Sequence, residues 1–394
     1  MARVLLVNQY YAPDTTSTAA YVAGIAEHLA AVGHDVRVVC GQPSYGEDAA
    51  RLAPRTVQNG VRVRRIDLGP RTGRASMGVR VFGYARFLAG AALRAVEAAH
   101  RRRPDVIITC HNPPLLPVLG ALLARWTGAR FVYIPWDLHP DILIATGFVP
   151  IPRPLERLWR AVNRFVFRSA SHIVVLTDAM RDELVEQGAT RERVEVIPLW
   201  PLTDVAPAPG AERDTAALNV LYAGNMGVLQ PLDAVLDAAV ELADAPIQLI
   251  LVGEGAKAAA WRDRAAREGL SRVRFLDRQP DPEFRTLLGA ADVGLVVNPP
   301  ELDRLAFPSR IYTFLAAGKP LVCLAQPGSA VAQVVDGSGS GWIAADGPAL
   351  AALLRELAAD PDRVAAASRR ASETSARRFS RPVVLRSFED VVAR

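Results

Sequence analysis

The sequence predicts an α/β fold of two doubly wound domains, each a parallel sheet covered by helices. Two segments, starting at Arg3 and at Asn219, each read as a buried strand, a turn and a helix, which is how a parallel-sheet unit begins. Many strand-like runs are continuous Val, Ile and Leu, as is typical of strands covered on both faces. A chain of 394 residues exceeds the usual size of one core, which favours two domains.

Strand-like runs alternate with helix-like segments along the whole chain. In the first half we expect strands at 4–7, 35–40, 61–66, 106–110, 131–134, 173–176 and 194–197. In the second half we expect them at 220–223, 247–252, 273–276, 293–297 and 321–324. This alternation predicts right-handed crossovers in both sheets.

Proline and glycine mark the expected domain boundary. We assign 1–200 to a first, acceptor-binding domain, 201–216 to a linker and 217–375 to a second domain that binds the donor. The remaining segment, 376–394, contains a helix that we expect to pack back on the first domain.

The composition excludes several classes of protein. The longest uncharged apolar run, near 115–124, is too short to span a bilayer, and the chain enters a strand without a signal-peptide pattern. Cys40, Cys110 and Cys323 lie in apolar strand-like runs, so we read them as core residues in a reducing compartment. We therefore expect a cytoplasmic protein.

The positive charge is concentrated in the first half of the chain. Residues 1–200 carry 25 Arg and Lys against 17 Asp and Glu, whereas the remainder carries 21 against 24. Two basic, aromatic and amphipathic segments, near 71–103 and 153–168, predict peripheral contact with an anionic membrane surface. The alternative is that each helix packs its apolar side on the sheet and leaves its arginines in water. No nucleic-acid-binding motif accompanies these segments.

The strongest chemical signal is the segment 307–322. A proline and a serine precede a helix of about nine residues, which Gly318 ends. The free N–H groups and positive dipole end of that helix suit a diphosphate, and Arg310 adds a cation at the same place. The alternative is a surface arginine beside an ordinary capped helix. The predicted donor-binding residues of this segment are Pro308, Ser309, Arg310, Ile311, Tyr312 and Thr313.

Three further loops follow strands of the second domain and so meet at the same edge of its sheet. Glycines in the first of them allow a backbone to approach a ligand closely, although a simple turn is an equally good interpretation. The predicted donor-binding residues of these loops are Gly224, Asn225, Met226, Gly227, Gln230, Gly253, Glu254 and Arg278.

These motifs together resemble the family-4 glycosyltransferases of the GT-B fold, most closely those that build bacterial surface polysaccharides and related glycoconjugates. The resemblance rests on 224–227 with Gln230, on 308–310 with 315–320, on 8–14, on 33–36 and on 136–140. It implies two Rossmann-like domains with a cleft between them. It also implies retaining transfer of a sugar from a nucleotide diphosphate donor, such as a UDP- or GDP-sugar, without a metal or other cofactor. The acceptor is expected to be a glycan, a lipid-linked sugar or a natural product.

The chain departs from its relatives at two pairs of positions. Many relatives carry an Arg and a Lys that grip the diphosphate where this chain has the neutral Asn225 and Gln230. Many also carry two glutamates where this chain has Leu305 and Thr313. These losses leave Arg310 as the main expected cation for the phosphates.

The resemblance places the reacting sugar beside loops of the first domain. A residue of the loop 135–140 contacts the transferred sugar in the family, so we expect Asp137 or His139 to orient sugar hydroxyls or to stabilise positive charge at the anomeric carbon. Asp14 is expected to bind an acceptor hydroxyl, or alternatively to cap the following helix. The expected acceptor-side residues are Thr15, Thr16, Ser17, His111 and Asn112.

Two other functions are compatible with the same sequence features. A sugar-nucleotide epimerase of this fold would need several acid/base carboxylates near the anomeric centre, and a catalytically silent partner of another transferase would account for the two departures. Asp360-Pro361-Asp362 resembles a metal-binding Asp-x-Asp motif, but its place before a helix favours capping, and no metal site is expected.

Overall fold

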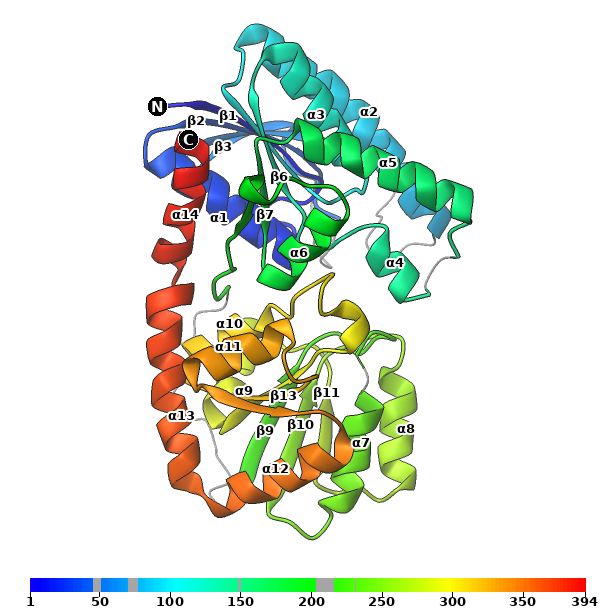
Figure 1. Ribbon diagram of the computed structural model, residues 1–394, viewed down its shortest axis with the longest axis vertical. Helices are drawn as coiled ribbons and strands as arrows, with labels where there is room; N and C mark the ends of the chain where they lie inside the picture. Colours follow the sequence, from blue (N-terminus) through cyan, green and yellow to red (C-terminus); the bar gives the residue numbers. More distant parts are fainter. Residues whose placement is uncertain (45–50, 70–76, 148–149, 203–215, 231) are drawn as a thin grey trace. The chain divides into compact units, whose positions relative to one another are not determined.

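The computed structural model describes residues 1–44, 51–69, 77–147, 150–202, 216–230 and 232–394, and its chain divides into two compact units (Figure 1). Unit 1 comprises Met1–Ile144, Phe148–Pro198 and Val384–Arg394, and unit 2 comprises Ala145–Gly147 and Leu199–Val383. Most of the predicted linker, 203–215, lies outside the described residues.

The sheet of unit 1 has eight strands in the order β3-β4-β2-β1-β5-β6-β7-β8. All pairs are parallel except β3 with β4. The seven predicted strands are present with ends shifted by at most one residue, whereas β3 was not predicted because its sequence, RTVQ, is polar and partly exposed. The strands are β1 (Arg3–Val7), β2 (Asp35–Gly41), β3 (Arg55–Gln58), β4 (Val61–Ile66), β5 (Val106–Cys110), β6 (Arg130–Ile134), β7 (His172–Val175) and β8 (Val194–Val196).

Helices cover both faces of this sheet. Helices α2, α3 and α5 pack side by side on one face (Figure 1). The last helix, α14, belongs to unit 1: the Arg130 guanidinium donates to the Val392 carbonyl, and His28 Nε2 lies 3.5 Å from a Glu389 oxygen. The helices are α1 (Ser17–Ala31), α2 (Met77–Arg101), α3 (Leu116–Thr127), α4 (Asp141–Ala145), α5 (Arg153–Ser169), α6 (Asp178–Glu186) and α14 (Arg381–Ala393).

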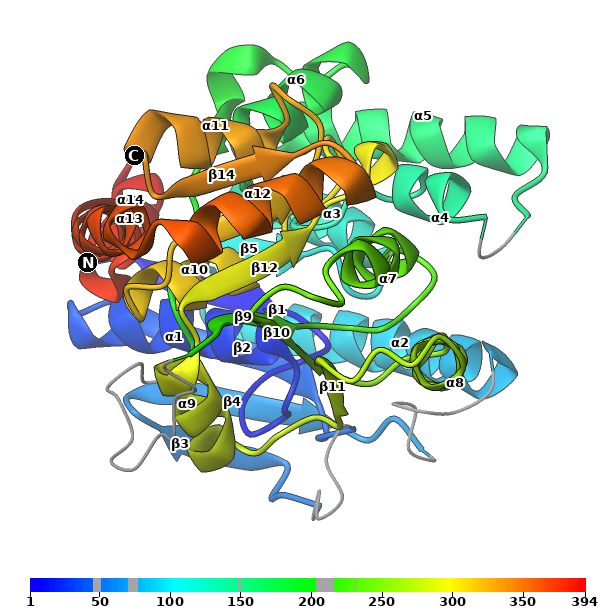
Figure 2. The ribbon, with the colours of Figure 1, turned by 90° about the horizontal axis from the view of Figure 1, so that it is seen from below.

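The sheet of unit 2 has six parallel strands in the order β11-β10-β9-β12-β13-β14 (Figure 2). The five predicted strands are present, and β14 is an additional edge strand. The strands are β9 (Leu218–Ala223), β10 (Ile247–Val252), β11 (Val273–Leu276), β12 (Val293–Val297), β13 (Leu321–Leu324) and β14 (Gly341–Ala344). The helices are α7 (Leu232–Glu241), α8 (Ala258–Arg267), α9 (Asp281–Ala290), α10 (Arg310–Ala316), α11 (Ala330–Ser338), α12 (Gly347–Ala359) and α13 (Pro361–Thr374).

The alternation of side chains along β9 shows why two helical layers are needed in unit 2. Val220 and Tyr222 join the core cluster that α7, α8 and α12 form, whereas the equally buried Leu221 points to the opposite face. On β12, Gly294 leaves room for the Phe314 ring of α10, because a Cβ there would lie 2.4 Å from the ring. The predicted doubly wound architecture is therefore confirmed in both units.

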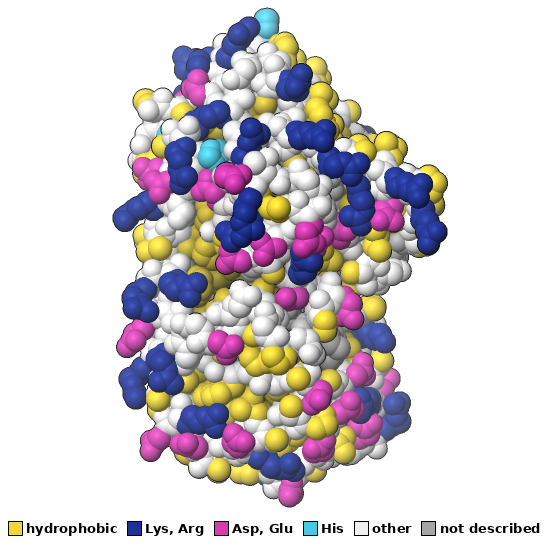
Figure 3. Space-filling model, viewed as in Figure 1, with side chains coloured by type: hydrophobic (Ala, Val, Ile, Leu, Met, Phe, Trp, Pro, Cys, Tyr) yellow, Lys and Arg dark blue, Asp and Glu magenta, His cyan; other side chains and the backbone are white. Residues whose placement is uncertain are grey.

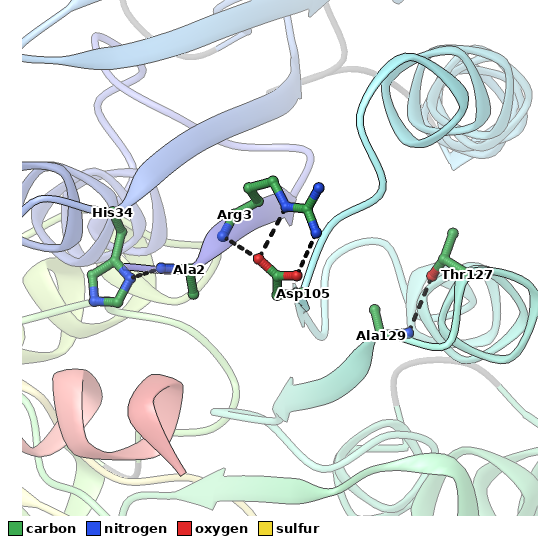
Figure 4. A network of polar contacts seen from close by, with 6 residues as sticks. All are labelled: Ala2, Arg3, His34, Asp105, Thr127 and Ala129. Carbon is green, nitrogen blue, oxygen red and sulfur yellow. Dashed lines mark hydrogen bonds and ion pairs between the residues drawn. The ribbon is translucent and has the colours of Figure 1, made fainter.

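A polar network fixes the amino-terminal edge of the unit 1 sheet (Figure 4). The Arg3 backbone N–H and guanidinium donate to the Asp105 carboxylate at 2.6–3.0 Å, which ties the start of β1 to the segment before β5. The hydrogen bonds from Arg3 hold the pKa of Asp105 at about 2. With their amino ends fixed, β1 and β5 deliver their following loops side by side at the opposite edge.

Candidate active site

Each sheet has a point where the strand order reverses, and the loops on either side of it diverge. In unit 1 this point lies between β1 and β5, and in unit 2 between β9 and β12. Ligands of open α/β sheets bind at the carboxyl ends of the strands beside such a point. Most of the predicted site residues lie in loops at these two edges.

In unit 1 the structure brings four predicted residues together. His111 follows β5 and is 2% exposed, and its Nε2 lies 3.0 Å from an Asp137 oxygen. The His139 ring lies 6.1 Å from the His111 ring, centroid to centroid. The Asn112 amide is 2.7 Å from the same His111 nitrogen. His111, which the sequence placed with the acceptor, thus forms one cluster with Asp137 and His139.

The cluster contains an anion beside a neutral imidazole. Burial raises the pKa of Asp137, but the charge and hydrogen bond of His111 lower it by more, so its pKa lies below the ordinary value. Burial, reinforced by the charge of His111, lowers the pKa of His139 to about 4. At neutral pH, Asp137 therefore supplies negative charge, while His139 can only donate or accept a hydrogen bond.

Several buried polar atoms of this edge have no hydrogen-bond partner in the protein. They are His111 Nδ1, His139 Nδ1, Trp136 Nε1 and both side-chain amide atoms of Gln9. Buried polar groups are rarely left in this state, so these atoms mark positions for ligand or water. Gln9 and Trp136 lie within the motifs 8–14 and 136–140, but neither was predicted to be a site residue. A polar residue directly after a buried strand is the signal that could have singled out Gln9.

The first loop is held by Asp14. The Asp14 side chain is 6% exposed, and its oxygens accept hydrogen bonds from Ser44 N at 2.9 Å and from Thr16 N at 3.3 Å. The helix cap is Thr16, whose hydroxyl accepts from Ala19 N, so the alternative interpretation of Asp14 as the cap is wrong. Thr15 and Ser17 are exposed beside it.

In unit 2 the loops after β9 and β10 form one backbone platform. Met226 N donates to Glu254 O at 2.8 Å, and Lys257 N donates to Met226 O at 3.0 Å. Gly253 has a φ of +153°, and a Cβ there would lie 1.9 Å from Gly224 O, so only glycine fits. Met226 is fully buried and its backbone N–H and carbonyl are both used in these bonds, so it holds the platform together and does not itself face a ligand.

Helix α10 is shorter than predicted, with seven residues where about nine were expected. The side chains of Ile311, Tyr312 and Thr313 are buried, so a ligand outside the core would reach only their backbone. The N–H groups of Ile311 and Tyr312 already donate to Pro308 O and Ser309 O at 3.2 Å. The end of this helix is therefore a weaker anion site than the sequence suggested, and Arg310 gains importance.

Arg310 lies close to the platform. Its guanidinium carbon is 4.8 Å from the centre of the Phe284 ring, which supports it from α9. Burial raises the pKa of the Tyr222 hydroxyl, and the nearby charge of Arg310 opposes that rise. The Tyr222 hydroxyl in turn donates to Asn225 O at 2.8 Å. The charge of Arg310 thus acts on Tyr222, whose hydroxyl is tied to the loop after β9.

The other predicted donor residues differ in accessibility. Asn225, Glu254 and Arg278 are exposed, Arg278 on the loop after the edge strand β11. Gln230 is half-buried, and its side-chain oxygen has no partner in the protein. The Ser309 hydroxyl forms no capping bond within α10, and Gly227 is buried beside Asn225.

Asp360 has the structural role that its position favoured. Its side chain accepts a hydrogen bond from Arg363 N at 3.0 Å and so caps α13. The three cysteines are buried and unbridged, as expected.

Comparison with known proteins identifies the family. Residues 17–200 match the model of a glycosyl transferase 4-like domain, and residues 217–360 match that of glycosyl transferases group 1. The chain is 25% identical to the probable glycosyltransferase WbjE of Pseudomonas aeruginosa over 91% of its own length and 90% of that protein. It is 26% identical to the putative colanic acid biosynthesis glycosyl transferase WcaI of Escherichia coli K12, over 85% and 86%.

Solved structures of glycosyltransferases have the same fold. The structure of Anabaena HepE in complex with UDP superposes with a TM-score of 0.72 at 17% identity, over 99% of both chains. The two doubly wound units, the paired family models and these relatives lead to one conclusion: the chain belongs to the family-4 glycosyltransferases of the GT-B fold.

Proposed function

We propose that this glycosyltransferase is a retaining, metal-independent enzyme that transfers a sugar from a UDP- or GDP-sugar to a hydroxyl of a glycan, lipid-linked or natural-product acceptor. The observation that carries the proposal is the place of the exposed Arg310 at the start of α10, with its charge acting on Tyr222 of β9 at the reversal point of the unit 2 sheet. A guanidinium there matches the charge and geometry of a diphosphate. The relatives' names, which mention colanic acid biosynthesis and UDP, point to the same substrates.

In this proposal unit 2 holds the nucleotide. Arg310 binds the diphosphate, and the Ser309 hydroxyl and Asn225 amide add neutral hydrogen bonds, in place of the second cation that many relatives carry. Gly224, Gly227 and Gly253 let the loops after β9 and β10 pack closely, which positions the exposed Asn225 for the ligand. Thr313 and Leu305 are buried, so we do not assign them a contact with the ribose.

Unit 1 would act on the sugar. The Asp137 carboxylate, ionised because His111 lowers its pKa, would stabilise positive charge as the anomeric bond breaks. His139, which is neutral, would hold a sugar hydroxyl. With retention, the departing phosphate can take the acceptor proton, so Asp14 serves to shape the loop that carries Thr15 and Ser17.

Nucleotide binding tests the proposal most directly. Titration calorimetry with UDP, GDP and ADP, followed by their sugars, should give one tight base. Arg310→Ala should weaken that affinity at least tenfold, since a charged hydrogen bond contributes roughly 1.5–3 kcal/mol. Arg274→Ala, an exposed arginine on β11, is the matched control and should leave the affinity unchanged.

Analysis of the product tests whether the chain transfers the sugar, and with which stereochemistry. Incubation with the bound donor and an acceptor should yield a glycoside of unchanged anomeric configuration, detected by NMR. An affinity that Arg310→Ala leaves intact would contradict the phosphate assignment, and an inverted product would contradict retention. We further propose that the enzyme acts in the cytoplasm at the inner face of the membrane, where lipid-linked acceptors are made.

A further inference from the structure

Helix α5 carries an apolar stripe that the core of unit 1 uses only in part. Leu155, Leu158, Val162 and Phe165 recur every three or four residues along it, so they share one side. Leu155 is 49% exposed and Leu158 is 60% exposed, whereas Val166 and Phe167 are the helix's buried side chains. The first half of α5 therefore offers large aliphatic side chains to the surroundings.

The same helix carries unpaired positive charge. Arg153, Arg157, Arg164 and Arg168 are exposed, and none of them forms an ion pair with a residue in the described ranges. Arg160 is the exception, since it pairs with Asp141 at 2.7 Å and with Glu156 at 2.9 Å. Four cations thus flank the apolar stripe without an internal counter-charge.

The other basic segment of the sequence differs in this respect. On α2, Arg94 and Arg101 both pair with Glu97, at 3.1 and 3.0 Å, and Arg102, just after the helix, lies 3.5 Å from an Asp35 oxygen. Arg71 and Arg74 lie outside the described residues. Arg86 of α2 is exposed and lies over the Phe82 ring, 5.8 Å from its centre. Within the described residues, α5 therefore carries more arginines without an ion pair than α2 does.

Helix α3 extends this surface. It packs against α5, and its Leu122 and Trp126 are both 53% exposed, with Arg125 exposed between them in sequence. In Figure 3, Lys and Arg side chains gather with hydrophobic ones in the upper right, where Figure 1 draws α3 and α5. Exposed leucine and tryptophan beside arginine is the composition of helices that lie in a membrane interface.

We propose that this face of α5, with α3 beside it, docks on the surface of an anionic lipid bilayer. Lipid phosphates would neutralise the four free arginines while Leu155 and Leu158 enter the boundary between headgroups and acyl chains. An apolar protein partner would fit less well, because it would bury those arginines without counter-charges. None of the described helices is long and apolar enough to pass through a bilayer, so the contact is with the surface.

The docking helix also touches the candidate active site. The Asn163 side chain of α5 donates a hydrogen bond to the His139 backbone oxygen at 2.6 Å. Membrane contact would therefore place the loop that carries Asp137 and His139 near the lipid surface. The docking proposal itself does not depend on the proposed reaction, and it is tested without substrate.

Vesicle flotation tests the docking surface. The protein should bind vesicles of phosphatidylglycerol and phosphatidylcholine in equal parts, should not bind pure phosphatidylcholine, and should dissociate as salt is added. The double variant Leu155→Glu/Leu158→Glu should lower the partition coefficient about tenfold or more. The triple variant Arg157→Gln/Arg164→Gln/Arg168→Gln should do the same. These side chains are exposed, so thermal unfolding should stay unchanged.

A matched control changes the same residue types in unit 2. Val240 on α7 is 47% exposed, and Arg272 and Arg274 are exposed near or on β11. Val240→Glu and Arg272→Gln/Arg274→Gln should bind vesicles as the parent protein does. A loss of binding in these controls equal to that of the α5 variants would overturn the assignment to α5.

Insertion of α5 into the bilayer surface can be measured at the position of Leu158. The native cysteines are buried, so Leu158→Cys can be labelled selectively with an environment-sensitive dye, and its emission should shift to shorter wavelength on anionic vesicles. The same label at Val240→Cys should not respond. Equal binding to neutral and anionic vesicles would overturn the proposal. So would a lipid-free dimer that Leu155→Glu/Leu158→Glu dissociates, because a second copy would then cover this face.

Discussion

The depressed pKa of His139 makes a quantitative prediction about stability. In the folded chain burial lowers its pKa from 6.5 to about 4, so His139 binds a proton less readily than in the unfolded chain. The stability that this group contributes is complete above pH 6.5 and is lost as the pH falls toward 4, because the unfolded state binds the extra proton. His139→Gln removes this proton binding.

The size of the effect follows from the two pKa values. At pH 5 the unfolded His139 is almost fully protonated and the folded one almost fully neutral, which favours unfolding by about 2 kcal/mol. At pH 7 the same difference is about 0.2 kcal/mol. The free energy of unfolding of the parent protein, relative to His139→Gln, should therefore fall by about 2 kcal/mol between pH 7 and pH 5.

Urea unfolding at several pH values measures this difference. Because the two units can unfold separately, the transition should be followed with a probe in unit 1. His100→Gln is the control, since His100 is exposed on α2 and folding does not remove it from water. A parent-to-variant difference that stays constant from pH 7 to pH 5 would refute the claim that burial keeps His139 neutral.

Three further substitutions test other parts of the structure. Gly253→Ala should destabilise unit 2 by more than about 2 kcal/mol in thermal unfolding, because the new Cβ would lie 1.9 Å from Gly224 O. Its control, Gly337→Ala, should be tolerated because a Cβ there meets nothing within 4 Å. Asp360→Ala should cost about 1 kcal/mol by loss of the α13 cap, and a wild-type melting temperature would show that the cap contributes nothing. Asp137→Asn should lower kcat about a hundredfold and leave nucleotide affinity unchanged, whereas lost affinity would place Asp137 with the nucleotide.

Local pattern was sufficient to predict most of the secondary structure. Strands such as β5 and β12 are unbroken apolar runs because both faces of a parallel strand are covered, so their sequences are unambiguous. The strand β3 was not predicted because an exposed edge strand such as RTVQ has no apolar run. Gly318 ends α10 as predicted, since it follows the cap Ala317 with a φ of +66°, and only the length differs, seven residues where about nine were expected.

The candidate site was only half predictable. Loops at the carboxyl ends of strands were identifiable, and so were Arg310, Asp137 and His139, because their positions follow from the strand order that the pattern implies. Which of these residues contact one another was not predictable. His111 lies next to Asp137 because β5 and β6 are paired in register, which brings together two loops far apart in the chain.

The sequence by itself determined the fold class, the family and the chemistry on offer, because periodicity, strand-end loops and motif spacing are local properties. Tertiary structure decided which groups are accessible and which are charged. It buried Tyr312 and Thr313 and keeps His139 neutral at pH 7. It also paired Arg94 and Arg101 of α2, while four arginines of α5 have no ion pair with the described residues. The physical reason is that burial and electrostatic interaction depend on neighbours in space, and these come from segments that are distant in the chain.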